Sequence, residues 1–251
     1  MNTKRFIAIL LILVLALTLA ACNTTTGTGT QEETTSASGP PSDDMSAPVR
    51  IGDIIEFGDY NWRVLEVIDG KVLLLSDQII EPNIYHLELK DITWEKSFLR
   101  QSINSRILEE FTKEEQEQII ETKISNPDNL WYGTKGGADT KDKLFLLSLA
   151  EVDRYFGDSG DYLNERRKKY TDGSYQENDA GSVFSNAYDS DRVAILGYGD
   201  SWWWLRSPGA AGATAAVVNI GGEVNVRGRD VDNMHPDMGG VRIALWLNMG
   251  S

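Results

Sequence analysis

The stretch Trp202-Trp203-Trp204-Leu205-Arg206-Ser207-Pro208-Gly209 opens the segment that decides the fold. It begins with an aromatic and apolar run at residues 202–205, which we expect to form a strand. Three further runs rich in apolar residues follow, at residues 215–218, 223–226 and 241–247. Gly221-Gly222 stands directly before the run at residues 223–226, where a turn between strands would lie. The C-terminal fifty residues are therefore predicted to form strands.

Strands are also predicted at residues 49–57 and 62–68, where apolar and polar side chains alternate. Asp69-Gly70 then separates Val67-Ile68 from the apolar run at residues 72–75. Asp-Gly between two such runs is a strong signal for a two-residue hairpin.

Helices are predicted between these two groups of strands. Apolar residues recur at helical spacing at Trp94, Phe98, Leu99, Ile103, Ile107 and Leu108. Two capping boxes follow. Thr112 with Glu115 should start a helix through residues 119–120, and Ser148 with Glu151 a helix through Phe156.

Strands, then two to three helices, then strands indicate an α+β fold with an antiparallel sheet. Residues 126–142 are predicted to form a long loop and residues 144–147 a buried strand. Residues 157–200 are polar and show no clear periodicity. Long polar stretches of this kind tend to be functional or disordered.

The first residues have the pattern of an export signal. Lys4 and Arg5 precede an apolar run, and Leu19-Ala20-Ala21-Cys22 supplies small residues before the only cysteine. The run is shorter than the roughly 20 residues that span a bilayer. The tetrapeptide resembles the bacterial lipobox, which implies cleavage after Ala21 and lipidation of Cys22. A cleaved signal with a chance cysteine, or an uncleaved anchor helix, is the alternative.

Composition sets the domain boundaries and excludes nucleic acid as a partner. Removal of the signal peptide, residues 1–21, takes away Lys4 and Arg5 and changes the net charge from −14 to −16. A surface this acidic argues against binding to nucleic acid, whose phosphates are also negative. Residues 22–48 are rich in Thr, Ser, Gly and Pro and have too few apolar side chains to fold, so they are predicted to form a flexible tether. Residues 49–251 then form a single domain.

Several motifs resemble a bacterial domain-of-unknown-function family whose pattern is W-W-L-R-S-P-G … A-x-V … G-x-V … G-V-R-P-A-L-W-L. The late motifs are Trp203-Trp204-Leu205-Arg206-Ser207-Pro208-Gly209, Ala216-Val217-Val218, Gly222-Glu223-Val224 and residues 240–247. Residues 61–65, 92–100, 126–129 and 139–148 agree upstream, so the resemblance covers residues 50–249. Ile243 replaces the usual proline. The family is distantly similar to the C-type-lectin-like fold, as in formylglycine-generating enzymes and the variable proteins of diversity-generating retroelements.

The enzymes of that fold use chemistry that this sequence lacks. Formylglycine generation needs a pair of cysteines on copper, and the chain has only Cys22. Iron-dependent relatives use a histidine cluster, whereas His86 and His235 are far apart. Ser207 lacks the flanking glycines of a nucleophile elbow. We therefore expect no catalytic residue, no cofactor and no metal site, and a hydrolase using two carboxylates remains the enzymatic alternative.

Two acidic motifs are candidate cation sites. Glu81-Pro82-Asn83 has the letters of a lectin calcium motif, but it lies early in the chain, so a turn is the better interpretation. Asp230, Asp232, Asn233 and Asp237 fall in one segment without the spacing of an EF-hand. A solvated acidic loop is favoured there.

We chose the late segment as the candidate binding surface, here called the late surface: Trp202, Glu223, Asn225, Arg227, Arg229, Asp232 and His235. In a strand, Trp202 and Trp204 share one face and Trp203 has the other. Trp202 is predicted to be the most exposed of the three; packing in the core is the favoured interpretation for it, and a ligand-binding role is the alternative. Glu223, Asn225 and Arg227 alternate with valines, which gives either a ligand face or an ordinary solvated face.

These observations predict an extracytoplasmic lipoprotein held to the cell membrane or cell surface by the lipid on Cys22. Its domain is expected to bind an unidentified glycan or protein without catalysis. An extracytoplasmic hydrolase of envelope polymers and a structural envelope lipoprotein are the alternatives.

Overall fold

The computed structural model describes residues 48–157, 182–233 and 239–250. All of them belong to one compact unit, Ala47–Ser251. The predicted signal peptide, Cys22 and all of the predicted tether except Pro48 lie outside the described residues. Within the described ranges, no helix is long and apolar enough to cross a membrane.

A five-stranded antiparallel sheet joins the first strands of the domain to its last one. Its order is β1-β2-β3-β15-β5. The strands are β1 (Ile54–Phe57), β2 (Tyr60–Ile68), β3 (Lys71–Ser76), β15 (Ala244–Asn248) and β5 (Ile119–Ile120). Asp69 and Gly70 turn the β2–β3 hairpin with φ angles of 48° and 72°, so the predicted two-residue hairpin is confirmed.

A six-stranded sheet is built mainly from the late segment, in the order β4-β14-β11-β12-β13-β8. The strands are β4 (Glu81–Pro82), β14 (Gly240–Val241), β11 (Trp203–Pro208), β12 (Thr214–Val218), β13 (Val224–Asp230) and β8 (Val183–Phe184). Only β11 and β14 pair in parallel. Two small hairpins complete the described strands: β6 (Thr122–Ile124) with β7 (Thr140–Asp142), and β9 (Ala194–Leu196) with β10 (Gly199–Ser201).

The strand predicted at residues 241–247 is split between the two sheets. Its start is β14 of the six-stranded sheet, and its end is β15 of the five-stranded sheet. Arg242 is buried at the junction, where Nε donates to the carbonyl of Ser76 and Nη2 to that of Asp77, each at 3.1 Å. Its guanidinium lies 5.0 Å from the Trp203 ring centroid. The prediction of one strand was wrong because these contacts turn the chain from one sheet to the other.

The first predicted helix is a helical segment of four pieces, interrupted at Ser97, where the backbone is extended. They are η1 (Trp94–Lys96), α1 (Phe98–Ser102), the wider turn η2 (Ile103–Ile107) and η3 (Leu108–Glu110). The buried side chains Trp94, Leu99, Ile103 and Ile107 have the predicted spacing. The Thr112–Glu115 capping box starts α2 (Lys113–Gln118) as predicted. The helix ends before Ile119, because Ile119 and Ile120 pair with β15 instead.

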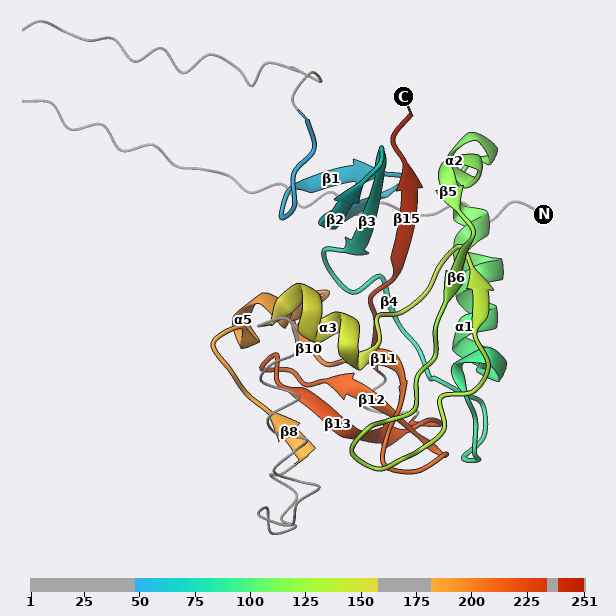
Figure 1. Ribbon diagram of the computed structural model, residues 1–251, viewed down its shortest axis with the longest axis vertical. Coiled ribbons are helices and arrows are strands. Elements are labelled where there is room, and N and C mark those ends of the chain that lie inside the picture. The colour runs from blue at the N-terminus through green and yellow to red at the C-terminus, as the bar shows by residue number, and fades with distance from the viewer. Residues whose placement is uncertain (1–47, 158–181, 234–238, 251) are drawn as a thin grey trace, which may run out of the picture. The chain divides into compact units, whose positions relative to one another are not determined.

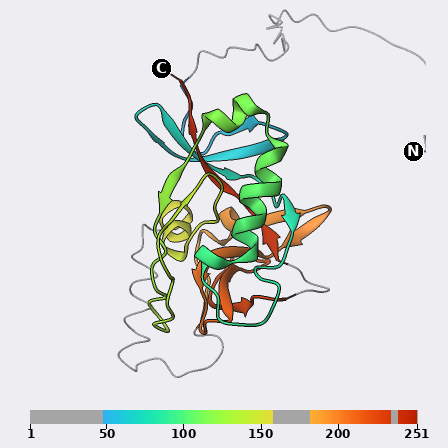
Figure 2. The same ribbon diagram turned by 90° about the vertical axis from the view of Figure 1, so that its right-hand side faces the viewer.

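Helix α3 (Leu149–Phe156) lies between the two sheets (Figure 1). The Ser148–Glu151 capping box starts it as predicted, and the short helix α5 (Asp189–Arg192) follows later in the chain. Residues 144–147 are buried as predicted but make only one bridge, between Phe145 and Ala244, so they are not a strand. The turned view in Figure 2 keeps α3 between the sheets.

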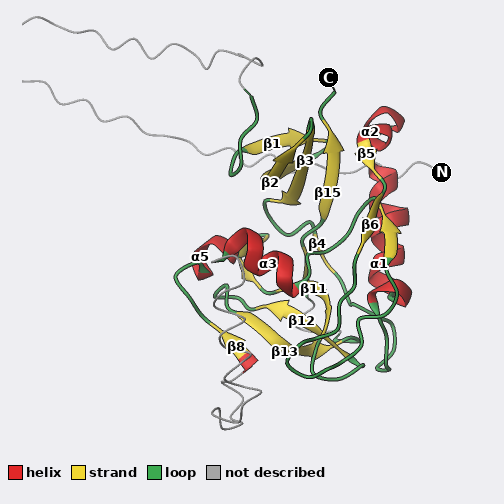
Figure 3. Ribbon diagram, viewed as in Figure 1, coloured by secondary structure: helices red, strands yellow, loops and turns green. Residues whose placement is uncertain are grey.

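The described part of the chain is α+β, with mainly antiparallel sheets and few helices, as Figure 3 shows by colour. The prediction of that class is confirmed, but the strands form two larger sheets where one was expected. This division matters for the site, because α3 contacts both sheets through polar side chains.

Candidate functional site

Trp202 is buried within the late surface. Only 6% of the residue is exposed, its ring lies edge-on to Trp204 at 4.8 Å between centroids, and Arg229 lies over it at 4.4 Å. Trp202 and Trp204 therefore share one face, as predicted, and Trp203 packs elsewhere with its N–H donated to the Arg192 carbonyl. Trp202 is the most exposed of the three tryptophans, as predicted, because Trp203 and Trp204 are fully buried; its favoured interpretation as a core residue is also confirmed, because Trp204 and Arg229 pack against its ring.

The β13 residues of the late surface alternate as predicted. Val224 and Val226 are buried, Glu223 and Asn225 are half-buried, and Arg227 is exposed. Gly228, with a φ of 78°, interrupts the alternation, and its N–H donates to Asn225 Oδ1. Asn225 is therefore engaged in shaping the strand, and a ligand-binding role for Glu223, Asn225, Arg227 and Arg229 stays a prediction.

The acidic part of the late segment falls only partly within the described residues. Asp232 is half-buried, whereas His235 and Asp237 lie outside the described residues. Among the described residues, no group of three or more His, Cys, Asp or Glu side chains is placed to hold a metal ion. His86 accepts a hydrogen bond from the Phe98 N–H, and burial, followed by nearby Lys90, lowers its pKa.

Glu81-Pro82-Asn83 lies beside a late strand in space, although it is early in the chain. Glu81 and Pro82 form β4, which pairs with β14, so the predicted turn was wrong at these two positions. Glu81 is bound by Arg106 and by the Asn83 amide. The Glu81 carboxylate therefore neutralises the Arg106 guanidinium.

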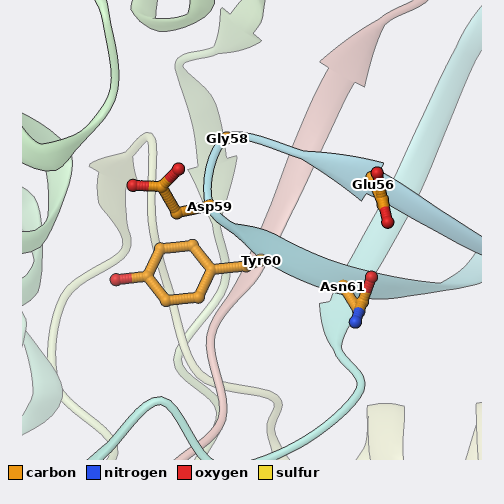
Figure 4. A pocket seen from close by; sticks show the side chains of 5 residues that line it. All are labelled: Glu56, Gly58, Asp59, Tyr60 and Asn61. Atoms are coloured by element: carbon orange, nitrogen blue, oxygen red, sulfur yellow. The ribbon is translucent and has the colours of Figure 1, made fainter. Parts of the chain in front are cut away.

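One surface depression, of about 270 Å³, lies at the turn between β1 and β2 (Figure 4). Asp59 and Tyr60 project at the turn, and Glu56 and Asn61 are neighbours across the two strands. The Tyr60 hydroxyl donates to Glu110, and burial followed by this bond raises its pKa. All the residues that line the depression belong to the β1–β2 hairpin, and the Tyr60 hydroxyl is already bonded to Glu110.

A larger cavity of about 400 Å³, here called the α3 groove, lies between the five-stranded sheet and α3. Its lining comes from β2 and β3 (Glu66, Ile68, Leu73), from β15 (Trp246), from residues 122–125, from α3 (Glu151, Arg154, Tyr155), and from Phe145 and Arg206. Six separate segments of the chain, with the β2–β3 hairpin counted as one, therefore meet at one cavity.

The floor of the α3 groove is one row of the five-stranded sheet. Glu66 pairs with Leu73 across β2 and β3, and Leu73 pairs with Trp246 across β3 and β15. Partners directly opposite in adjacent strands project from the same face of a sheet. Trp246 is half-buried. The indole N–H groups of Trp62, Trp94, Trp203 and Trp204 are bonded to protein oxygens, whereas those of Trp246 and of the more distant Trp131, which does not line the groove, have no such bond within the described ranges.

Helix α3 forms one wall and is tied to the floor at Glu66. Arg154 Nη2 lies 2.9 Å from Glu66 Oε1, and the Tyr155 hydroxyl donates to Glu66 Oε2. Burial, then the hydrogen bond to Glu66, raises the pKa of Tyr155, which therefore keeps its proton at neutral pH. Both oxygens of the Glu66 carboxylate are thus fixed in place.

A second ion pair closes the inner end of the groove. Arg206 holds both oxygens of Glu151, one of them at 2.8 Å from Nη2, and donates to the Leu146 and Ser125 carbonyls. Burial acts to raise the pKa of Glu151, but the charge and hydrogen bonds of Arg206 outweigh it and hold that pKa below its usual value. Arg206 Nε is buried without a hydrogen-bond partner in the described part of the chain.

The ionised side chains that line the α3 groove are all paired within the protein. Glu66 is paired with Arg154, Glu151 with Arg206, and Lys123 with Asp139 at 2.9 Å. The groove therefore offers an aromatic side chain, several hydrogen-bonding atoms and a balanced charge, although the chain as a whole carries a net charge of −14.

The sequence contained a signal for three residues of the α3 groove. Arg206 and Trp246 fall in the first and last of the late motifs, and Glu151 completes a capping box. Their meeting in space was not predicted, because Glu66 and Tyr155 come from segments with no shared pattern. The groove does not include any residue of the late surface.

The described residues form an α+β domain with a groove built from several segments of the chain. Comparison with known families shows to which family the chain belongs. A family model described as "Domain of unknown function (DUF6273)" matches residues 69–249, and the chain belongs to that family. The match covers most of the segment over which the motif resemblance extends. No curated protein and no solved structure matches the chain.

Proposed function

We propose that the protein is an extracytoplasmic lipoprotein whose domain binds a ligand in the α3 groove without catalysis. The observation that carries this proposal is the groove itself, in which a half-buried tryptophan is framed by fixed polar groups. Ligand sites of proteins are typically concave, about 300–1,000 Å³ in volume, and mostly formed before the ligand binds. The α3 groove, at about 400 Å³, fits this description in volume.

Binding accounts for the groove better than hydrolysis does. Glu66 and Glu151 are the two carboxylates that line it. A glycosidase-type mechanism needs one carboxyl group with a raised pKa to protonate the leaving group. The pKa of Glu151 is instead lowered, and its charge is used to hold Arg206. Glu151 is therefore a structural carboxylate, which leaves Glu66 without an acid partner among the lining residues.

The anchor and the C-type-lectin-like assignment are parts of the same proposal. Support for the anchor comes from the lipobox-like Leu19-Ala20-Ala21-Cys22 after an apolar run. Support for the lectin-like assignment comes from the late motifs and from the α+β class of the domain. Together they describe a ligand-binding domain held near a membrane by the lipid on Cys22.

The proposal is tested by probing arrays of immobilised glycans and envelope proteins with the full chain. We expect binding that is lost in Trp246→Ala and in Arg154→Ala, whose side chain is 61% exposed and so is dispensable for folding. Tyr198→Ala is the matched control, because this aromatic side chain is fully exposed on the β9–β10 hairpin and outside the groove.

Two results would contradict the proposal. One is binding that neither groove variant alters. The other is conversion of the bound ligand into products by the wild-type chain, with loss of that turnover in Glu66→Gln.

A further inference from the structure

We infer that the ligand of the α3 groove is a neutral saccharide, one ring of which packs against the Trp246 side chain. This inference rests on the proposed function and names its ligand class. It follows from four properties of the groove, which are its size, its charge pairing, its supply of hydrogen-bonding atoms and the apolar surface of Trp246.

The size of the groove favours a small ligand. A stable protein partner typically buries about 800 Å² on each side of an interface. The α3 groove is a compact cavity of about 400 Å³, walled by α3 on one side and by residues 122–125 on another. A ligand of one or two rings suits this space, whereas a flat protein surface would not reach Trp246 at its floor.

Charge pairing favours a ligand without net charge. Glu66, Glu151 and Lys123 each have a partner of opposite charge within the protein. A charged ligand would compete with one of these partners or enter without a counter-charge. Breaking the Glu151–Arg206 pair is unfavourable because Arg206 is buried, whereas competing with the exposed partners Arg154 and Lys123 costs less. A neutral ligand leaves all three pairs intact.

The remaining hydrogen-bonding capacity favours hydroxyl groups. An ionised carboxylate has about four acceptor sites and a guanidinium has five N–H donors. Glu66 uses its sites for Tyr155 and Arg154, and Arg154 donates one N–H to Glu66. Acceptors and donors therefore remain side by side, and a hydroxyl group both donates and accepts.

Trp246 supplies the apolar surface that such a ligand needs. A tryptophan side chain combines a large apolar face with one N–H donor. A sugar ring presents C–H groups on its faces and hydroxyls around its edge. Because the Trp246 N–H has no protein partner among the described residues, it can be donated to a ring hydroxyl when the ring packs against the indole.

The test is calorimetric titration of the full chain in a zwitterionic detergent without a sugar headgroup. The neutral probes are cellotetraose, mannotetraose and chitotetraose. Tetragalacturonate is the anionic probe and the chitosan tetramer is the cationic probe. We expect at least one neutral probe to bind better than both charged probes, with affinity about tenfold weaker in Trp246→Ala and unchanged in Tyr198→Ala.

A second variant tests the role of charge without removing the aromatic side chain. Glu66→Gln leaves Arg154 without its carboxylate and gives the groove an unpaired positive charge. We expect its affinity for tetragalacturonate to be about fivefold higher than that of the wild-type chain. No gain for this probe would overturn the argument from charge pairing.

The outcomes separate this inference from the proposed function. A charged probe that binds best and depends on Trp246 overturns the neutral ligand but leaves the groove as a binding site. Absence of binding by every neutral probe also overturns the inference, while a protein ligand on the array that depends on Trp246 would preserve the proposed function. Saccharide binding that Trp246→Ala does not change overturns both.

Discussion

Arg206 shows how a single buried side chain fixes the position of α3. Its guanidinium joins the Glu151 carboxylate to the carbonyls of Leu146 and Ser125, and only 3% of its side chain is exposed. A buried cation is stable only while its partner carries the opposite charge. The orientation of α3, and with it one wall of the α3 groove, therefore depends on ionised Glu151.

At the residue scale, we predict that Glu151→Gln lowers the free energy of unfolding by about 3 kcal/mol at pH 7. Glutamine is also accepted at this position of a capping box, so the start of α3 is retained while the charge is lost. Denaturant titration followed by tryptophan fluorescence measures the change. Glu121→Gln, at an exposed position, is the control and should change stability by less than about 0.5 kcal/mol.

The same pair of variants tests the effect of pH. The pKa of Glu151 is lower in the folded protein than in the unfolded chain, where it is about 4.3. Its stabilising contribution is therefore fully present above the unfolded pKa and is lost as the pH falls through the folded pKa. The difference between wild type and Glu151→Gln should shrink on acidification below about pH 4.3. A difference that stays constant would refute the assigned role.

At the scale of elements, local patterns predicted those features that depend on neighbouring residues. The Asp69-Gly70 hairpin and both capping boxes are present because each is determined within four residues of sequence. Ile119-Ile120 and residues 241–247 were wrongly assigned because their structure depends on distant partners. Ile119 and Ile120 pair with β15, and Arg242 bonds to carbonyls that follow β3.

Gly70 provides the prediction at this scale. Its φ of 72° is unfavourable for any residue with a side chain, and a Cβ placed there would meet no atom within 4 Å. Gly70→Ala should therefore lower the free energy of unfolding by about 1–2 kcal/mol through backbone strain alone. Thermal unfolding followed by circular dichroism measures this loss.

Gly199 is the matched control for Gly70. It also lies in a hairpin with open space around it, but its φ is outside the left-handed region. Gly199→Ala should change stability by less than about 0.5 kcal/mol. Equal losses in the two variants would show that the cost at Gly70 does not come from its backbone conformation.

At the scale of the whole molecule, the α3 groove was beyond prediction for a physical reason. Its residues come from positions between Glu66 and Trp246, and only pairing of β15 with β3 brings the ends together. The sequence pattern instead pointed to the late surface, where polar and apolar side chains alternate. The burial of Trp202 beneath Arg229 depends on a tertiary contact that no periodicity encodes.

The prediction at this scale concerns attachment of the whole chain to a membrane. We expect the wild-type chain to incorporate radiolabelled palmitate and to sediment with membranes, and Cys22→Ser to do neither, because lipid chains provide the membrane affinity. Thr26→Ser, close to the predicted cleavage site, is the control and should retain the label. Incorporation of label by Cys22→Ser would show that the lipid is attached elsewhere.

The place of β15 in the five-stranded sheet determines when that sheet can form. β15 lies between β3 and β5, so Leu75 pairs with Ala244 and Ile119 with Leu247, both near the C-terminal end of the domain. Contacts between residues so far apart in the chain are slow to form. During synthesis, the β2–β3 hairpin is available early, but its sheet stays incomplete until residues 244–248 have left the ribosome. Folding of the domain is therefore expected to follow synthesis, which leaves the newly made chain unfolded and so compatible with the proposed export.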